Sequence, residues 1–342
     1  MTIGDANESD SKGNRIKRSL LSLLQSPKTR RRLIFVIIAA IVLTLALVLT
    51  AGIFKNLPST MPPTADLLSP KDRFGINRLY PAAPGGIEWS AKWDDGQART
   101  LGNEVDPADV WFDTTDGDGM YTIDGKGTLT ASGDVVRMYV RDPAKEREWS
   151  ENLEITLYFK RLDETQIVSY SGLQVFARTN HGMVGNENIN YCDDRGYGGL
   201  VGINGSWALE KESAHHLDNG YTDVARQRPS GALPEDTWIG FKYILRNMDG
   251  GTKVKLELYR DTTSGLNGGN WQKVTEFVDD GNNFGVGRGE CRPGVDAGLP
   301  LIHSFINDSS ETKKPMLSVY ARHEYGTMEY SNFSIREIGP LP

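Results

Sequence analysis

The side chains best suited to chemistry concentrate between residues 180 and 221, where three of the five histidines of the chain lie. Imidazole and phenol groups exchange protons with a substrate, and charged side chains hold polar ligands through hydrogen bonds. The segment therefore predicts a polar ligand site or a catalytic site, with a solvated loop as the alternative. The candidates are His181, Tyr191, Arg195, Tyr197, Lys211, Glu212, His215, His216 and Tyr221, and the catalytic candidates among them are His181, Tyr197 and His215.

The adjacent histidines of this segment are poor joint ligands of one metal ion. Neighbouring residues of a strand point to opposite faces, which separates His215 from His216. A transition-metal site remains an option if one of them joins Asp193, Asp194 or Glu212.

A second acidic stretch resembles the start of a calcium loop. Asp116 and Asp118 alternate with glycines, and Asp113 lies close by. The full twelve-residue pattern with its closing glutamate is absent. We expect either calcium, with Asp116 and Asp118 among its ligands, or a simple acidic turn.

Two stretches far apart in the chain repeat one pattern. Residues 175–182 read VFARTNHG and residues 319–326 read VYARHEYG. If both are strands of one sheet, their aromatic and arginine side chains form a single face. Aromatic rings stack on sugars, and arginine forms bidentate hydrogen bonds with carboxylates. The predicted ligand-binding residues of this face are Phe176, Arg178, Tyr320 and Arg322, and Gln174 points outward on the first of the two strands. Chance similarity of the two stretches is the alternative.

Strands must position these residues. Apolar and polar residues alternate with period two over 152–162, 171–178, 237–246 and 253–259, the mark of half-buried strands. No helical pattern appears after residue 60. Strands joined by Gly- and Asp-rich turns predict an all-β, antiparallel two-sheet sandwich over 111–338, after an irregular lead-in over 74–110.

The N-terminal part predicts a membrane anchor. Residues 33–54 form an apolar run without a charge, long enough to span a bilayer as a transmembrane helix. Arg30, Arg31 and Arg32 precede it, so the positive-inside rule predicts a cytoplasmic tail over 1–32. A Pro-rich stalk over 55–73 then leads to an extracellular C-terminal domain, in a single-pass protein of the cell membrane. A cleaved signal peptide is the alternative.

The chain contains only two cysteines, Cys192 and Cys291, both in loop-like stretches. Outside the cell they would form one disulfide, and two free thiols are the alternative. Asn204, Asn307 and Asn332 begin glycosylation triplets.

Charge argues against nucleic acid as a partner. Residues 1–32 contain eight Lys or Arg and three Asp or Glu, so with −7 for the whole chain the rest carries −12. Phosphate binding requires a basic face instead.

Three stretches resemble the concanavalin A-like lectin/glucanase superfamily, and in particular uncharacterised secreted prokaryotic, mainly archaeal, domains. They are Met120 to Val140, Trp149 to Gly182, and the run from DTWIGFKYILRN to YSNFSIREI, so that the likeness covers about Trp111 to Ile338. The resemblance implies a jelly-roll sandwich that faces carbohydrate as a lectin, a glycoside hydrolase or a polysaccharide lyase.

The catalytic motifs of that superfamily are incomplete here. The glucanase strand E-x-D-x-x-E is absent, and Glu154, Glu164 and Glu257 are isolated. The lyase strand Q-x-H reads Gln174-Val175-Phe176, without its histidine. We therefore expect a membrane-anchored, extracytoplasmic carbohydrate-binding domain for a cell-envelope glycan, acidic glycans included. A lyase or hydrolase, and a structural envelope protein, are the alternatives.

Overall fold

The computed structural model describes residues 70–149, 152–181, 195–215, 220–286, 298–301, 305–307, 312–314 and 316–340. The predicted tail, membrane helix and nearly all of the stalk lie outside these residues, and so do Tyr191, Cys192, His216 and Cys291. Within the described residues, no helix has the length and apolar character that a membrane crossing requires.

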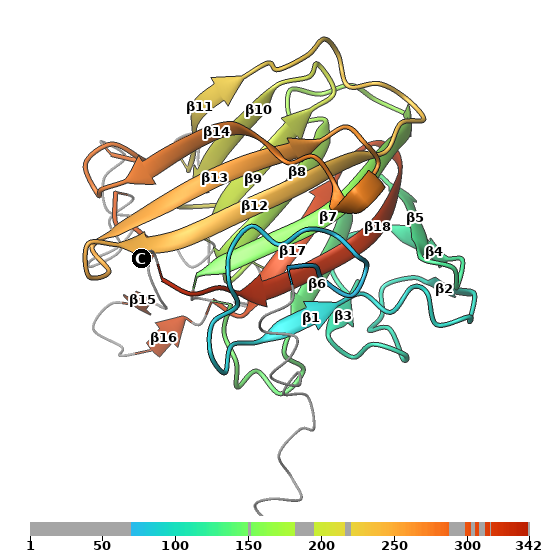
Figure 1. Ribbon diagram of the computed structural model, residues 1–342, viewed down its shortest axis with the longest axis horizontal. Helices are drawn as coiled ribbons and strands as arrows, with labels where there is room; N and C mark the ends of the chain where they lie inside the picture. The colour runs from blue at the N-terminus through green and yellow to red at the C-terminus, as the bar shows by residue number, and fades with distance from the viewer. Residues whose placement is uncertain are drawn as a thin grey trace, which may run out of the picture. The chain divides into compact units, whose positions relative to one another are not determined.

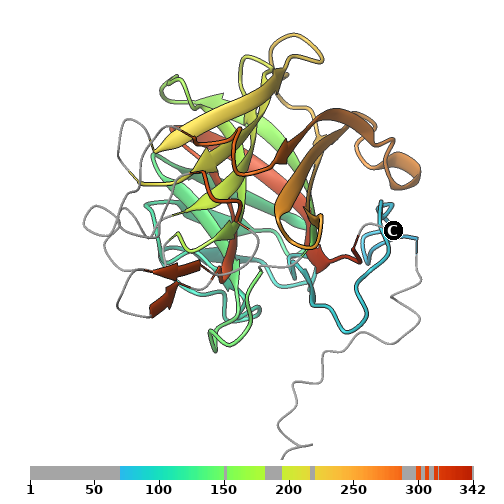
Figure 2. The same cartoon turned by 90° about the vertical axis from the view of Figure 1, so that its left-hand side faces the viewer.

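The described residues form two stacked antiparallel sheets (Figure 1), seen from a second side in Figure 2. The nine-stranded sheet runs in the order β14 (Gln272–Asp279), β13 (Lys253–Asp261), β12 (Ile239–Met248), β7 (Leu153–Glu164), β18 (Gly326–Glu337), β5 (Thr128–Gly133), β4 (Met120–Ile123) and β2 (Arg99–Leu101), and β1 (Glu88–Ser90) also pairs with β18.

The seven-stranded sheet lies behind it in Figure 1. Its order is β11 (Tyr221–Gln227), β10 (Trp207–Glu212), β9 (Gly196–Gly202), β8 (Gly172–Thr179), β17 (Ser318–His323), β6 (Val136–Arg141) and β3 (Phe112–Asp113). A separate hairpin joins β15 (Phe305–Asn307) to β16 (Thr312–Lys314), and the only helical element of the described residues is the 3-10 turn η1 (Leu266–Gly268). The predicted antiparallel two-sheet sandwich is confirmed.

One apolar core fills the space between the sheets, because alternate residues of each strand point inward. From the nine-stranded sheet it takes the predicted inner faces of β7 and β12, and from the other sheet those of β8 and β17. The predicted inward residues confirmed in this core are Leu153, Ile155, Leu157, Phe159, Leu173, Val175, Ala177, Ile239, Phe241, Tyr243, Leu245, Val319 and Ala321.

The lead-in predicted to be irregular is part of the sandwich. It supplies β1 and β2 to the nine-stranded sheet, and Trp89 and Trp93 are buried in the core. The blue lead-in crosses in front of β7 and β18 in Figure 1. Its backbone reaches the outer face of the sheet, where Leu79 N donates to Glu154.

That outer face holds a buried ionic network instead of solvated charges. Lys242 and Arg246 point outward from the core, as predicted, yet they are 1% and 3% exposed. Lys242 Nζ lies 2.8 Å from Glu154 Oε1, and Arg246 Nη2 lies 2.8 Å from Glu257 Oε2. Tyr80 of the lead-in stacks on Arg246, with the guanidinium carbon 3.9 Å from its ring centre. The alternation predicted the face correctly, and the lead-in covers it.

Candidate functional site

The outer face of the seven-stranded sheet aligns seven residues in one row across the strands. Period-two alternation places them on this face, and antiparallel register sets them opposite one another. From β3 to β11 the row is Asp113, Tyr139, Tyr320, Phe176, Gly198, Glu210 and Asp223. A neighbouring row contains Arg137, Arg322, Gln174 and Leu200.

The predicted aromatic pair shares the first row, but both rings are buried and absent from the groove lining, so the prediction that they contact a ligand is wrong for the described structure. Phe176 and Tyr320 are register partners, and their rings stack with centres 5.1 Å apart and planes 8° from parallel. Tyr139 adds a third ring 4.9 Å from Tyr320. All three are buried and form an apolar cluster separate from the main core. Gly198 leaves room for it, because a Cβ there would lie 3.0 Å from the Phe176 ring.

A groove of about 910 Å³ opens beside this cluster. Its lining includes the predicted Gln174 and Arg322 together with His215 and Tyr221. Tyr170, in the loop between β7 and β8, also lines the groove and is 45% exposed. The remaining charged residues of the lining are Arg137, Glu210, Asp223, Arg226 and Glu324.

Two carboxyl groups of the groove face each other directly. Glu210 on β10 is the register partner of Asp223 on β11. Burial, and then the charges of Asp223 and Glu212, raise the pKa of Glu210 well above its usual range. Like charges opposite one another in a sheet destabilise it, so this pair favours a proton on Glu210 that Asp223 can accept as a hydrogen bond.

Each arginine of the groove pairs with a carboxylate of the lining, and two of them share the same carboxylate. Arg137 Nη2 lies 3.2 Å from Glu324 Oε1, and Arg322 pairs with the same carboxylate. Arg226 pairs with Asp223. With Glu210 protonated, the arginines Arg137, Arg226 and Arg322 outnumber the carboxylates Asp223 and Glu324 by one, so the groove presents fixed hydrogen-bonding groups and a small positive charge.

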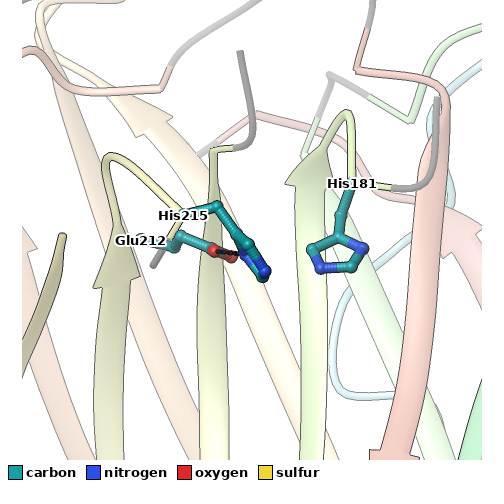
Figure 3. A group of neighbouring side chains, drawn as sticks. All are labelled: His181, Glu212 and His215. Atoms are coloured by element: carbon teal, nitrogen blue, oxygen red, sulfur yellow. Dashed lines mark hydrogen bonds and ion pairs between the residues drawn. The ribbon is translucent and has the colours of Figure 1, made fainter. Parts of the chain in front are cut away.

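His181, Glu212 and His215 meet at one end of this face. His181 follows β8, Glu212 ends β10, and His215 comes three residues later. His215 Nδ1 lies 2.8 Å from Glu212 Oε1 and 3.1 Å from Tyr221 Oη. Figure 3 shows His181 beside the Glu212–His215 pair. The two imidazole centres lie 5.3 Å apart, with the ring planes 74° from parallel. Burial acts to raise the pKa of Glu212, but the hydrogen bond from His215 and the neighbouring imidazole charges lower it overall.

Three predicted site residues point between the sheets instead. Tyr197 Oη donates to Asp279 at 2.5 Å, and Lys211 Nζ lies 2.7 Å from the same carboxylate. Tyr197 and Lys211 are register partners on the inner face, so alternation excludes them from the groove. Burial, and then Asp279, raise the pKa of Tyr197.

Arg178 is the third predicted site residue that points between the sheets, but a backbone irregularity turns it inward. The register between β8 and β17 shifts there, and Arg178 has a φ of 49°. A bulge of this type redirects a side chain. Arg178 Nη1 donates to Asn247 Oδ1 and to the Leu301 carbonyl, each at 2.7 Å. The prediction of an outward Arg178 is wrong.

The acidic turn serves hydrogen bonding in the described residues. Asp116 Oδ2 accepts a bond from Tyr139 Oη at 3.0 Å, and Asp118 Oδ1 accepts one from Val135 N at 2.6 Å. Among the described residues, the one set of three or more close His, Cys, Asp or Glu ligands is His181, Glu212 and His215. Calcium at Asp116 and Asp118 stays a prediction, as does the Cys192–Cys291 disulfide.

Sequence reasoning missed Tyr139, Tyr170, Glu210 and Asp223. Tyr139 alternates outward within the apolar run VRMYVR, where it looks like a core residue. Glu210 and Asp223 could have been found by pairing the strands β10 and β11 as a hairpin, because that pairing places the two acidic residues opposite each other.

No protein-family model matches the chain, and no curated protein matches it. Solved structures do match. A protein of unknown function with a galectin-like fold from Bacillus subtilis is 12% identical, with a TM-score of 0.41, over 77% of this chain and 100% of that one.

Two further matches are carbohydrate-recognising domains by description. The exoplasmic/lumenal domain of VIP36, bound to Ca²⁺ and Man3GlcNAc, is 9% identical over 74% of this chain and 92% of its own, with a TM-score of 0.40. The carbohydrate recognition domain of Emp46p in its metal-free form is 11% identical over 72% and 98%, with a TM-score of 0.38. With TM-scores of 0.41 or less, these structural similarities do not assign a function to this chain.

Proposed function

We propose that the groove on the outer face of the seven-stranded sheet binds a carbohydrate, within a jelly-roll sandwich of the lectin type. The observation that carries this proposal is the open groove of about 910 Å³, whose lining combines planar hydrogen-bonding groups with an exposed tyrosine. This volume is at the upper end of the range for small-ligand sites, which suits more than one sugar unit.

The chemistry of the lining suits sugar hydroxyls. The amide of Gln174, the carboxyls of Glu210 and Asp223 and the guanidinium of Arg322 offer donors and acceptors at fixed positions of the sheet. Tyr170 offers an exposed ring on which a sugar can stack.

The existing ion pairs of the groove favour a neutral glycan over an acidic one. A glycan carboxylate would have to compete with Glu324 for Arg137 and Arg322, and with Asp223 for Arg226. Arg137 and Arg322, whose side chains are 9% and 14% exposed, would have to lose one paired carboxylate to gain another.

A glycan array followed by calorimetry on the best ligand tests this proposal. We expect binding that weakens about 10-fold or more in Tyr170→Ala and Gln174→Ala. Ile167→Ala is the matched control, because Ile167 lies in the same loop, is 71% exposed and is not part of the groove lining. Absence of glycan binding by the folded protein would refute the proposal.

An enzyme is the second candidate, on one specific observation. His215 and Tyr221 both line the groove, with Tyr221 Oη 3.1 Å from His215 Nδ1, which is a pair suited to proton transfer. A lyase would leave new unsaturated ends on the glycan, and a hydrolase new reducing ends. Turnover that is lost in Tyr221→Phe while glycan binding persists would favour the enzyme, and binding without products favours a lectin-like domain.

We also propose that residues 33–54 anchor the protein in the cell membrane, with the sandwich outside the cell. The support is the uncharged apolar run and the three arginines before it. Protease added to intact cells should remove the sandwich and leave residues 1–32 protected. Protection of the sandwich would reverse this topology.

A further inference from the structure

We propose that His181, Glu212 and His215 bind a divalent transition-metal ion of the zinc class at the end of the groove. One potential ligand atom from each of the three residues lies within 4.8 Å of the others, and all three side chains are buried. The proposal stands apart from carbohydrate binding, because it concerns the ion alone.

The ligand set matches this class of ion. Two imidazoles and one carboxylate are typical ligands of zinc sites that keep a fourth position open, and of related iron(II) sites. Calcium prefers oxygen ligands only, so this site differs in kind from the calcium predicted at Asp116. Zinc bonds of about 2.0–2.2 Å place tetrahedral ligand atoms roughly 3.3 Å apart. The ligand atoms lie within 4.8 Å of one another, so they would have to close by up to about 1.5 Å when the ion binds.

The strands hold two of the ligands in place. Glu212 is the last residue of β10, and His181 lies two residues beyond the end of β8. His215 lies 2.8 Å from Glu212 and also lines the groove. The ion would replace the proton that these two residues share, and His215 is the one of the three ligands that borders the groove.

A hydrogen-bond chain behind His181 fixes its tautomer. The Tyr139 hydroxyl donates to Asp116 at 3.0 Å, so its oxygen accepts from Nδ1 of His181 at 2.8 Å. Nε2 is then the ring nitrogen that carries the lone pair. Histidine ligands of metals typically donate their second ring nitrogen to such a partner. Asp116 therefore acts on the site through Tyr139 and does not itself touch the ion.

The test uses the full-length protein, stripped with a chelator and then loaded with Zn²⁺ or Co²⁺. We expect one ion per chain by elemental analysis and, with Co²⁺, the visible absorption of a site with nitrogen ligands. His215→Gln and Glu212→Gln should abolish this stoichiometric binding. Tyr139→Phe should weaken it by about 10-fold to 100-fold, because it removes the group that orients His181.

His323→Gln is the matched control. His323 is equally buried, but its ring bonds Tyr330 and the Gly326 carbonyl, so this variant should bind the ion as the wild type does. Circular dichroism verifies that each variant is folded. If a ligand variant fails to fold, Tyr139→Phe and the Co²⁺ spectrum decide. No stoichiometric binding by the wild type, or binding unchanged in the folded ligand variants, would overturn the proposal.

Discussion

Replacing Glu154 by glutamine should destabilise the protein far more than removing a partly exposed charge of the same sheet. Glu154 is 1% exposed, and its carboxylate lies 2.8 Å from Lys242 Nζ and 2.5 Å from Arg336 Nη2. Burial acts to raise the pKa of Glu154, but Lys242 and Arg336 lower it overall, which keeps the group ionised. It also accepts hydrogen bonds from Leu79 N and Tyr80 N of the lead-in.

The expected loss follows from what the substitution leaves behind. Glutamine keeps the shape of the side chain but leaves two buried cations without their anion. Breaking a buried pair in this way costs about 3–5 kcal/mol. For a domain of this size that corresponds to a fall in Tm on the order of 10 °C. The lead-in should also exchange its amide hydrogens faster, because it loses its anchor.

Chemical denaturation and amide exchange measure both effects. Glu329→Gln is the matched control, since Glu329 pairs with Lys160 at 2.6 Å on the same sheet with both side chains about one-fifth exposed. Such a pair contributes less than about 1 kcal/mol. If Glu154→Gln cost no more than this control, water would have to reach the network, and the reasoning would be wrong.

Three further substitutions probe other parts of the fold. Burial, reinforced by nearby arginines, lowers the pKa of His323 to about 4, and its neutral ring accepts from Tyr330 and donates to Gly326. The unfolded chain therefore takes up a proton at a higher pH than the folded protein does. About 3 kcal/mol of the free energy of unfolding, fully present above pH 6.5, should be lost as the pH falls towards 4. If the free energy of unfolding of His323→Gln had the same pH dependence as that of the wild type, this reasoning would be contradicted. Gly172→Ala should cost more than about 2 kcal/mol in denaturation, because φ is +129° and a Cβ would lie 2.1 Å from a backbone oxygen of β9. Phe176→Ala should cost about 3–5 kcal/mol despite its place on an outer face, and a loss below 1 kcal/mol would show that the aromatic cluster is not packed.

The sequence predicted the inner faces of the strands because apolar alternation and burial have the same period. In β12, Ile239, Phe241, Tyr243 and Leu245 all face the core as expected. The shared face of Phe176 and Tyr320 was also predictable, since two similar strands needed only to pair.

Polar residues inside the sandwich were not predictable from the same pattern. Lys211 and Tyr197 share Asp279 between the sheets, although lysine and aspartate ordinarily mark a solvated face. The burial of Lys211, for example, depends on Asp279, which lies 68 residues further along the chain. Arg178 depends on a bulge that no local pattern announces.

The position of the last two strands has a consequence for how the protein is made. β17 lies between β8 and β6, and β18 lies between β7 and β5, so each inserts into the middle of its sheet. The chain is synthesised from its N-terminus, so the strands before β17 form first. Without β17 and β18, each sheet consists of two separate parts, and the strands that will flank the missing one have unpaired edges. Such edges invite pairing with other chains, and late, long-range closure makes folding slow. Both sheets can therefore close only after β17 and β18 have been synthesised, and until then the earlier strands expose edges that can pair with other chains.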